Sequence, residues 1–441
     1  MKRLLSLLLC AVLALFCATT AQAAGVSITL TASEYALHYA FDAGAQDPFV
    51  ILEYTTPAEK GWMMLYSADG HFEGDVSLAY SGAGGKTSVA LTSARTTGSI
   101  GKASTTLPKA ADYQKPTGKS NAKVMDFVLT ETPEGFHYAF NAAGTDYMLL
   151  YWRSKEQTVT QPVYPDENGH YEGDVISELT FARTQFTVQV KSGSGSMKKE
   201  ATVRKGYQAP EAPQRQEGRL SGVTVCIDAG HQENGRFVNE PIGPGLTGST
   251  SGKGGMAQGT KTNRRESIVC LEIGMLLRDE LLRQGANVIM TREDQTTFHT
   301  NIERCEIAEA GGAQIMLRLH CNNSSNHSKR GIQVYGPLNS DYAKAVADAD
   351  TYREMGQKLL DAMKTRVGMT LANSTGMVRL NDNYVGNNWA KMMCFLVEMG
   401  YLSNPAEEYL LVTPVYQQWL AEGMVDGVYE IAVARGWVQA Q

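Results

Sequence analysis

Three apolar segments in the second half of the chain end on a residue that could do chemistry. His231 follows "VCIDAG", His320 follows "QIMLRL" and Glu398 follows "MCFLV". Because ligands of parallel sheets collect at the carboxyl ends of the strands, we expect these side chains to reach one edge of a sheet. Glu266, in the first turn of the helix predicted after the first segment, can reach the same edge.

Residues of these types suit metal-assisted hydrolysis. Two histidines and one carboxylate are a common ligand set for a zinc ion that keeps a fourth position open for water. Such an ion lowers the pKa of its bound water to about 7 and polarises a carbonyl group, which favours the hydrolysis of an amide. A further carboxylate can take the proton of that water and pass it to the leaving amine, and Glu398 is the candidate.

Each residue also has a structural explanation. A single histidine at a strand end is more often a hydrogen-bonded structural residue than a ligand. Asn263, followed three residues later by Glu266, has the pattern of a capping box, which would close the start of the helix without a metal. Glu398 is harder to explain in this way, because an acid between Val397 and Met399 is costly unless it is paired or functional.

The segments that carry these residues alternate between strands and helices. Apolar strands are predicted at 223–228, 286–292, 314–322 and 393–400, and helices at 263–285, 301–313, 342–367 and beyond 403. This order predicts an α/β domain over residues 219–441, with a mainly parallel sheet flanked by helices.

The first half of the chain contains a duplication. "HYAFDAGAQDPFVILEY" recurs as "HYAFNAAGTDYMLLYW", and "DGHFEGDV" recurs as "NGHYEGDV". The paired histidines lie 99 positions apart: His38 and His137, His71 and His170. Alternating apolar residues and Gly and Asp turns predict two tandem all-β, sandwich-like repeats, residues 24–108 and 120–205. The recurring histidines and aromatic residues are interpreted as turn and core residues, with binding of a polymer as the alternative.

The two ends of this β-rich region have their own signals. Residues 206–218 are rich in proline and polar residues and predict a linker. Residues 1–23 combine a basic start, an apolar run and small residues, which predicts a signal peptide cleaved after Ala23, with an uncleaved membrane anchor as the alternative. No later segment has the length and apolarity to span a bilayer. We therefore expect a secreted or extracytoplasmic protein without a transmembrane segment in its mature chain.

Composition sets further bounds. A chain of 441 residues with 43% apolar residues exceeds the size of a single core, so more than one domain is expected. The net charge of -6 provides no general attraction to nucleic acid, and we expect no nucleic-acid partner. Five cysteines lie beyond the signal peptide, an odd number without short paired spacings, and are predicted to be small core residues rather than disulfide or zinc-knuckle partners. They are Cys226, Cys270, Cys305, Cys321 and Cys394.

Four segments resemble, in order, the motifs of a known family. "IDAGHQ", "NRRESIVCLEIGMLLRDELLRQGANVIMTRED", "LRLHCNN" before "RGIQVY", and "CFLVEMGYLSNPAEEYLL" are similar to the zinc-dependent N-acetylmuramoyl-L-alanine amidases, whose catalytic domain is of amidase type 3. The resemblance covers residues 221–436. It implies a cell-wall hydrolase that acts on peptidoglycan, at the amide between the lactyl group of N-acetylmuramic acid and L-alanine of the stem peptide.

The resemblance also implies roles for individual residues. His231, Glu266 and His320 would be ligands of Zn2+, and Glu398 would be the catalytic acid/base. Asp228 is interpreted either as supporting His231 or as the cap of a loop.

Some positions depart from the family pattern without removing a predicted ligand. Ala229 and Gln232 stand where the family often has proline and glycine, and residues 392–394 read Met-Met-Cys where a proline is usual. The loop between positions 231 and 266 is longer than in compact members. Two other functions stay open: a zinc peptidase that cuts within the stem peptide, and a non-catalytic wall-binding protein that keeps the fold as a scaffold.

Overall fold

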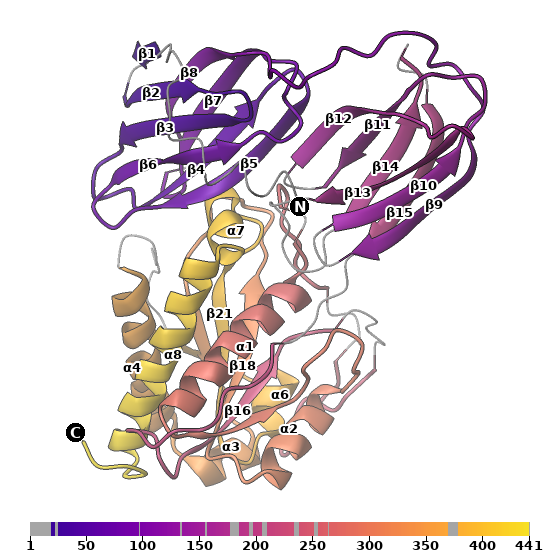
Figure 1. Cartoon of the computed structure of the whole chain (residues 1–441). Coiled ribbons are helices and arrows are strands. Elements are labelled where there is room, and N and C mark those ends of the chain that lie inside the picture. Colours follow the sequence, from indigo (N-terminus) through magenta and orange to yellow (C-terminus); the bar gives the residue numbers. More distant parts are fainter. Residues whose placement is uncertain are drawn as a thin grey trace. The chain divides into compact units, whose positions relative to one another are not determined.

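The chain divides into two compact units, Met1–Gly206 and Tyr207–Gln441 (Figure 1). This computed structural model describes residues 19–22, 25–96, 98–132, 135–154, 157–176, 185–193, 197–204, 210–232, 238–250, 255–262, 264–368 and 378–440. Most of the predicted signal peptide and Asn263 therefore lie outside the described residues. Among the described helices, none combines the length and apolarity needed to cross a membrane.

The first unit is all-β, as predicted, and begins with two facing sheets. Its first eight strands are β1 (Thr19–Gln22), β2 (Ser27–Ala32), β3 (Ala36–Asp42), β4 (Phe49–Thr55), β5 (Glu59–Tyr66), β6 (His71–Ser77), β7 (Gly85–Ser93) and β8 (Ser99–Leu107). One sheet has the order β1-β2-β3-β6. Alternate side chains of β2, β3 and β6 pack against those of β4 and β7 in an apolar core, because successive strand residues point to opposite faces.

The remaining strands of this unit follow the same plan. They are β9 (Met125–Thr132), β10 (Gly135–Asn141), β11 (Met148–Arg153), β12 (Gln157–Val163), β13 (His170–Ile176), β14 (Gln185–Lys191) and β15 (Met197–Arg204). β10 lies 99 positions after β3, and β13 lies 99 positions after β6. β13, β10 and β9 form a second small sheet, and its core holds the fully buried aromatic residues Phe136, Phe140, Trp152 and Phe186.

One sheet crosses both predicted repeats, a feature that the repeat pattern does not predict. Its order is β15-β14-β11-β12-β5-β4-β7-β8, and β12 joins β5 through three residue pairs. Beside this junction the buried carboxylate of Glu59 accepts hydrogen bonds from Gln157 Nε2 at 3.0 Å and from Ser81 Oγ at 2.9 Å. Because a buried acid needs donors, these bonds stabilise the junction between the repeats.

The second unit is an α/β domain, as predicted. Its strands are β16 (Thr224–Ala229), β17 (Asn287–Met290), β18 (Ile315–Asn322), β19 (Gln333–Gly336), β20 (Val378–Leu380) and β21 (Met393–Tyr401). They form one sheet in the order β17-β16-β18-β21-β19-β20. β17, β16, β18 and β21 pair in parallel, whereas β19 runs antiparallel to β21, so the sheet is mixed.

Helices cover both faces of this sheet. They are α1 (Glu266–Arg283), α2 (Asn301–Ala310), α3 (Asp341–Val346), α4 (Ala349–Val367), α6 (Val385–Trp389), α7 (Pro405–Leu411) and α8 (Pro414–Ala434). α8 packs on both α1 and α4, and α1 lies against β16 and β18. α2 and α6 cover an apolar cluster on the sheet that includes Cys226, Met316 and Cys394. All five cysteines predicted to be core residues are free and buried, which confirms that prediction.

The single helix predicted over residues 342–367 is wrong, because the chain breaks it into α3 and α4. Ala347 is extended, with φ of -165° and ψ of 162°. Asp348 then begins α4, and its side chain accepts a hydrogen bond from the Thr351 N–H at 2.8 Å. Aspartate satisfies the free N–H groups at a helix start better than it serves a helix interior, which explains the break.

The predicted linker, residues 206–218, is attached to the second unit over most of its length. The Gln216 N–H donates to the Leu282 carbonyl at 3.0 Å, and Arg278 Nη2 donates to the Pro210 carbonyl at 2.9 Å. Residues 210–218 therefore lie along α1. Composition could not predict this, because the partners of the segment lie more than 60 positions away.

Candidate metal and catalytic site

The carboxyl ends of three parallel strands bring the predicted site residues to one edge of the sheet. His320 on β18 and Glu398 on β21 are direct register partners, so their side chains leave the same face of the sheet. His231 follows β16, and the Gly230 N–H before it donates to the Leu319 carbonyl at 2.9 Å. The expected convergence is therefore present.

The backbone around His231 is unusual. His231 has a φ of +57°, in the left-handed region that residues other than glycine rarely adopt. At Gly230 an added Cβ would lie 2.6 Å from Cε1 of His320, so only glycine allows this approach. Strained backbone of this kind persists where the surrounding structure holds it, and it is common at functional sites.

Glu266 joins the two histidines. Its Oε1 atom lies 3.1 Å from His231 Nε2 and 3.0 Å from His320 Nδ1, and it accepts the Cys321 N–H at 3.0 Å. Oε2 accepts the Ala257 N–H at 2.7 Å. The ligand atoms of His231, Glu266 and His320 lie within 4.8 Å of one another, so these three residues could hold a metal ion.

The charges of this cluster also suit a cation. Burial raises the pKa of Glu266, but hydrogen bonds with both histidines outweigh it and hold that pKa well below its usual range. Burial lowers the pKa of His320, which favours the neutral imidazole that binds metals. His320 Nε2 is buried without a hydrogen-bond partner among the described residues, and a buried nitrogen of this kind fits a ligand position.

The capping-box explanation of Glu266 is wrong. α1 begins at Glu266 with Arg265 at its N-cap, and the Arg265 side chain forms no cap hydrogen bond. Glu266 is therefore the first residue of the helix rather than its third, and its carboxylate faces the histidines.

Glu398 lies beside the cluster in a different electrostatic state. Burial raises the pKa of Glu398 to about 8, with a further contribution from the negative charge of Glu266. Its Oε2 atom is buried and has no hydrogen-bond partner within the described part of the chain. Two carboxyl groups with pKa values pushed in opposite directions are typical of an acid/base residue next to a charged ligand.

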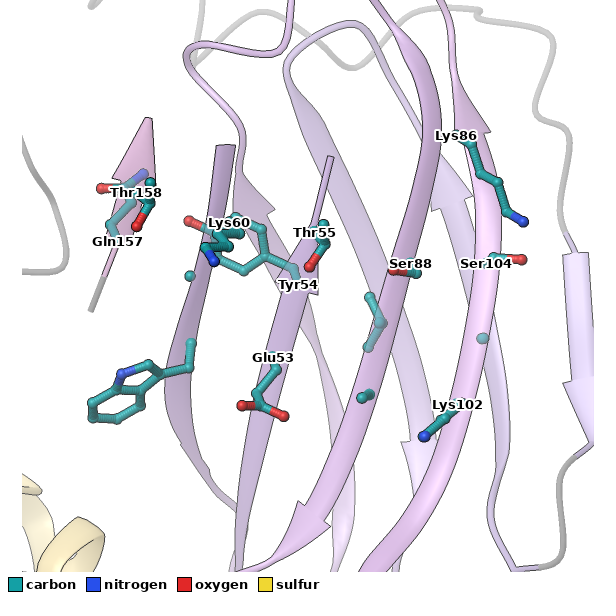
Figure 2. Close-up of a pocket in the computed structure, with 15 residues that line it drawn as sticks. Glu53, Tyr54, Thr55, Lys60, Lys86, Ser88, Lys102, Ser104, Gln157 and Thr158 are labelled. Atoms are coloured by element: carbon teal, nitrogen blue, oxygen red, sulfur yellow. The ribbon is translucent and has the colours of Figure 1, made fainter. Parts of the chain in front are cut away.

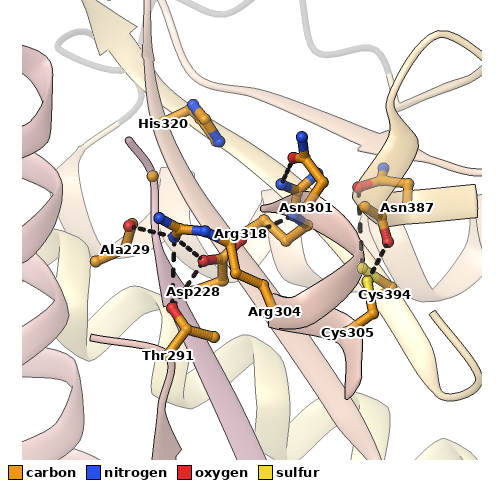
Figure 3. A network of polar contacts seen from close by, with 12 residues as sticks. Asp228, Ala229, Thr291, Asn301, Arg304, Cys305, Arg318, His320, Asn387 and Cys394 are labelled. Carbon is orange, nitrogen blue, oxygen red and sulfur yellow. Dashed lines mark hydrogen bonds and ion pairs between the residues drawn. The ribbon is translucent and has the colours of Figure 1, made fainter. Parts of the chain in front are cut away.

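Asp228 acts through two arginines rather than through the imidazole of His231. It is fully buried and forms ion pairs with Arg304 and with Arg318, whose Nε lies 2.9 Å away (Figure 3). Burial alone raises the pKa of Asp228, but the two guanidinium groups hold it well below its usual range. Arg304 Nη2 also donates to the backbone carbonyl of His231 at 3.2 Å. Asp228 therefore orients the arginine that supports the His231 backbone.

Arg292 ties two parts of the site together, and motif reasoning did not single it out. Its guanidinium group donates to the carbonyls of Ala229 at 2.8 Å and Gly230 at 2.9 Å. It also donates to the Ser267 carbonyl at 2.7 Å, in the first turn of α1. The segments that carry His231 and Glu266 are thus joined by one side chain, which follows a strand in the "TRED" segment.

The two glutamates of the "NPAEE" segment accept hydrogen bonds from backbone N–H groups near the site. Glu408 is fully buried and accepts hydrogen bonds from the Lys261 N–H at 2.9 Å and the Thr262 N–H at 3.1 Å. Glu407 accepts the Gly331 and Tyr401 N–H groups, each at 2.8 Å. These carboxylates fix the loop that enters α1 and the end of β21, so this part of the motif serves the position of the site.

Comparison with known proteins relates this unit to one family. Residues 225–430 match the family model described as N-acetylmuramoyl-L-alanine amidase. The matched residues, 206 of the 441, lie within the second unit. The resemblance noted in the sequence is confirmed.

Individual relatives match about half of the chain. A germination-specific N-acetylmuramoyl-L-alanine amidase of Bacillus subtilis is 26% identical over 231 residues, 49% of this chain and 83% of the relative. A probable cell wall amidase of Staphylococcus aureus, LytH, is 27% identical over 218 residues, 48% of this chain and 60% of the relative. An amidase structure from Clostridium difficile 630 has a TM-score of 0.38 at 23% identity, with 48% of this chain and 96% of that chain covered.

Proposed function

We propose that this protein is an extracytoplasmic N-acetylmuramoyl-L-alanine amidase. It hydrolyses the amide between N-acetylmuramic acid and L-alanine of peptidoglycan stem peptides. The observation that carries the proposal is the convergence of His231, Glu266 and His320 beside Glu398, inside the region that matches the amidase family. The names of the Bacillus subtilis and Staphylococcus aureus relatives support a substrate in the cell wall.

His231, Glu266 and His320 would hold the metal, for which we propose Zn2+. Their donor set, two imidazoles and a carboxylate, is a common zinc set, and the unpartnered Nε2 of His320 fits it. When bound, zinc supplies Lewis acidity and an acidic water. Asp228, Arg304 and Arg292 position the backbone of His231 and the start of α1.

Glu398 is the proposed acid/base. Its raised pKa lets this carboxyl group both accept and return a proton near neutral pH. In the ionised form it takes a proton from the attacking water, and in the protonated form it donates that proton to the nitrogen of the leaving L-alanine. The buried Oε2 atom has no competing partner among the described residues.

The first 23 residues would direct the chain out of the cytoplasm, and the two β-rich repeats would accompany the enzyme to the cell wall. We propose domain limits of 24–108 and 120–205 for the repeats and 219–441 for the catalytic domain.

The test is the identity of the ends released from peptidoglycan. Protein lacking residues 1–23 is incubated with purified peptidoglycan, with zinc or with a chelator, and the products are analysed by mass spectrometry. We expect stem peptides with a free N-terminal L-alanine in the zinc sample alone. Metal-dependent cuts inside the stem peptide would instead identify a peptidase, and intact peptidoglycan in both samples would favour the wall-binding scaffold.

A further inference from the structure

Polar side chains form one continuous row across the eight-stranded sheet of the first unit. Register partners on adjacent strands share a face of the sheet, so the row can be followed from pair to pair. From β14 to β8 it consists of Thr187, Arg153, Thr158, Lys60, Thr55, Ser88 and Ser104. None of these residues is buried. We call these seven residues the polar row.

The polar row spans both repeats. Its centre is the junction at which Thr158 of β12 pairs with Lys60 of β5. Figure 2 shows Thr158, Lys60, Thr55, Ser88 and Ser104 following one another across the sheet, on β12, β5, β4, β7 and β8. Seven strands at the usual spacing of about 4.8 Å give a track of about 29 Å. The track reaches this length because strands of both repeats belong to one sheet.

The face around the polar row is hollowed. A groove is lined by five residues of the polar row, from Thr158 to Ser104, and by a neighbouring line of residues that are register partners on β5, β4, β7 and β8: Trp62, Glu53, Ala90 and Lys102. The small residues Gly61, Ala90 and Ser88 lie within it. Small side chains leave room for a ligand, and hydroxyl groups supply donors and acceptors at regular intervals.

The charge of this face selects the ligand. Lys60, Lys86 and Lys102 outnumber the single acid, Glu53, among the groove residues, although the whole chain has a net charge of -6. Yet five of the seven residues in the polar row are hydroxyl residues and only two are cations. A ligand rich in hydroxyl and amide groups, with carboxylates at intervals, complements this pattern better than a phosphate polymer with a charge on every unit.

We propose that the polar row is a binding track for the glycan strand of peptidoglycan. Hydroxyl side chains bind the sugar hydroxyl and N-acetyl groups, and Lys60 and Arg153 bind carboxylates of the attached stem peptides. The choice of this polymer rests on the proposed function, because it is the substrate of the second unit. The track would hold the enzyme on an insoluble substrate without taking part in the chemistry.

The test is cosedimentation of the full chain with insoluble peptidoglycan from which phosphate polymers have been removed. Glu398→Gln is present in every sample so that the wall is not consumed. Lys60→Gln combined with Arg153→Gln is expected to weaken binding at least about tenfold, because hydrogen bonds to charged groups are lost. The matched control is Lys115→Gln combined with Lys123→Gln, two exposed lysines of the same unit that lie outside its strands. The control is expected to bind like the parent.

A second variant tests the hydroxyl residues. Thr55→Val and Ser88→Ala remove two hydroxyl groups from the centre of the track at nearly constant volume, and weaker binding is expected again. Equal binding of the parent and both track variants, with unchanged thermal unfolding, would overturn the proposal. Binding that appears only when phosphate polymers remain on the wall would also overturn it and would identify a phosphate polymer as the ligand.

A soluble substrate separates this proposal from the proposed function. With Glu398 intact, the Lys60 and Arg153 variant should cleave a small muramoyl peptide at the parent rate and insoluble peptidoglycan more slowly. If the parent cleaves neither substrate, the proposed function fails, whereas the cosedimentation result still decides the binding track.

Discussion

Histidines face carboxylates in both units of this protein, but their surroundings differ. His71 Nδ1 lies 2.7 Å from Asp42 in the first unit, and His320 Nδ1 lies 3.0 Å from Glu266 in the second. The side chain of His71 is 51% exposed, whereas those of His320 and Glu266 are 15% and 4% exposed. Similar distances therefore describe a surface ion pair in one unit and a candidate metal centre in the other.

The histidines of the two units differ in how many chain segments meet around them, as well as in burial. On the exposed face of β3 and β6 each histidine meets acids of the same two strands, and water competes for every contact. In the second unit, ligand atoms from a loop, a helix and a strand meet around one point, and one imidazole nitrogen is left without a partner among the described residues. Distance alone does not identify a site; buried atoms that need a partner do.

The largest expected effect of a substitution in the buried site of the second unit is on catalysis. Replacing Glu398 by Gln removes the proposed acid/base, and we expect kcat for release of stem peptides to fall about 10²–10⁴-fold, the usual contribution of general acid–base catalysis. Metal content and thermal unfolding should stay at wild-type values. Glu354→Gln, an exposed acid on α4, is the matched control. Wild-type turnover by the Glu398 variant would remove this residue from the mechanism.

The next effect is on stability. Asp228→Asn leaves Arg304 and Arg318 buried beside a neutral group, and we expect the free energy of unfolding of the second unit to fall by about 3–5 kcal/mol. Calorimetry can follow the transition of that unit. Asp42→Asn breaks the exposed pair of the first unit and should leave both transitions unchanged above the range in which His71 is protonated. Equal losses in the two variants would show that burial does not separate the two kinds of pair.

Metal binding should distinguish the two sets of histidines directly. Mutation of residues that only support metal ligands typically lowers metal affinity about 10–100-fold. His231 is a proposed ligand itself, so His231→Ala should weaken zinc binding by at least that much. His71→Ala should bind zinc as the parent does, measured by competition with a chromophoric chelator. Loss of zinc in the His71 variant, with no loss in the His231 variant, would move the metal site to the first unit.

The smallest effect concerns pH in the first unit. The hydrogen bond to Asp42 raises the pKa of His71, so the protonated pair contributes stability below the usual histidine value of about 6.5 and loses it as pH rises through the raised pKa. NMR titration of Asp42→Asn should show the pKa of His71 moving down. The corresponding position in the second repeat is naturally Asn141, which lies 2.8 Å from His170. An unchanged pKa of His71 would show that the pair is not formed in solution.

Much of the candidate site could be predicted because its signals are local. His231 follows an apolar strand, and His320 and Glu398 lie near the carboxyl ends of two others; apolar strands are readable from the hydrophobic pattern. Glu266 was recognisable from the motif, but its local pattern suggested a helix cap. Only the observed start of α1 removed that explanation.

The supporting residues could not be predicted in the same way. Arg292, Arg304 and Arg318 look like ordinary charged residues, since nothing in their neighbouring sequence shows that they are buried. The partners through which they hold the site, such as Ser267 for Arg292 and Asp228 for Arg318, lie 25 and 90 positions away. The break between α3 and α4 was missed for a different reason. Asp348, which caps α4, is a polar residue of a kind that also occurs on the exposed face of a continuous helix.

The sequence by itself determined the alternation of strands and helices in the second half, the duplication in the first half and a candidate set of metal-binding residues. All of these depend on patterns within a few residues or on direct self-comparison. Only the tertiary structure decided that two repeats share one sheet, that His231 adopts a positive φ, and that Asp228 acts through arginines. The physical reason is that strand pairing and burial join residues far apart in the chain, and their energies depend on partners that no local pattern specifies.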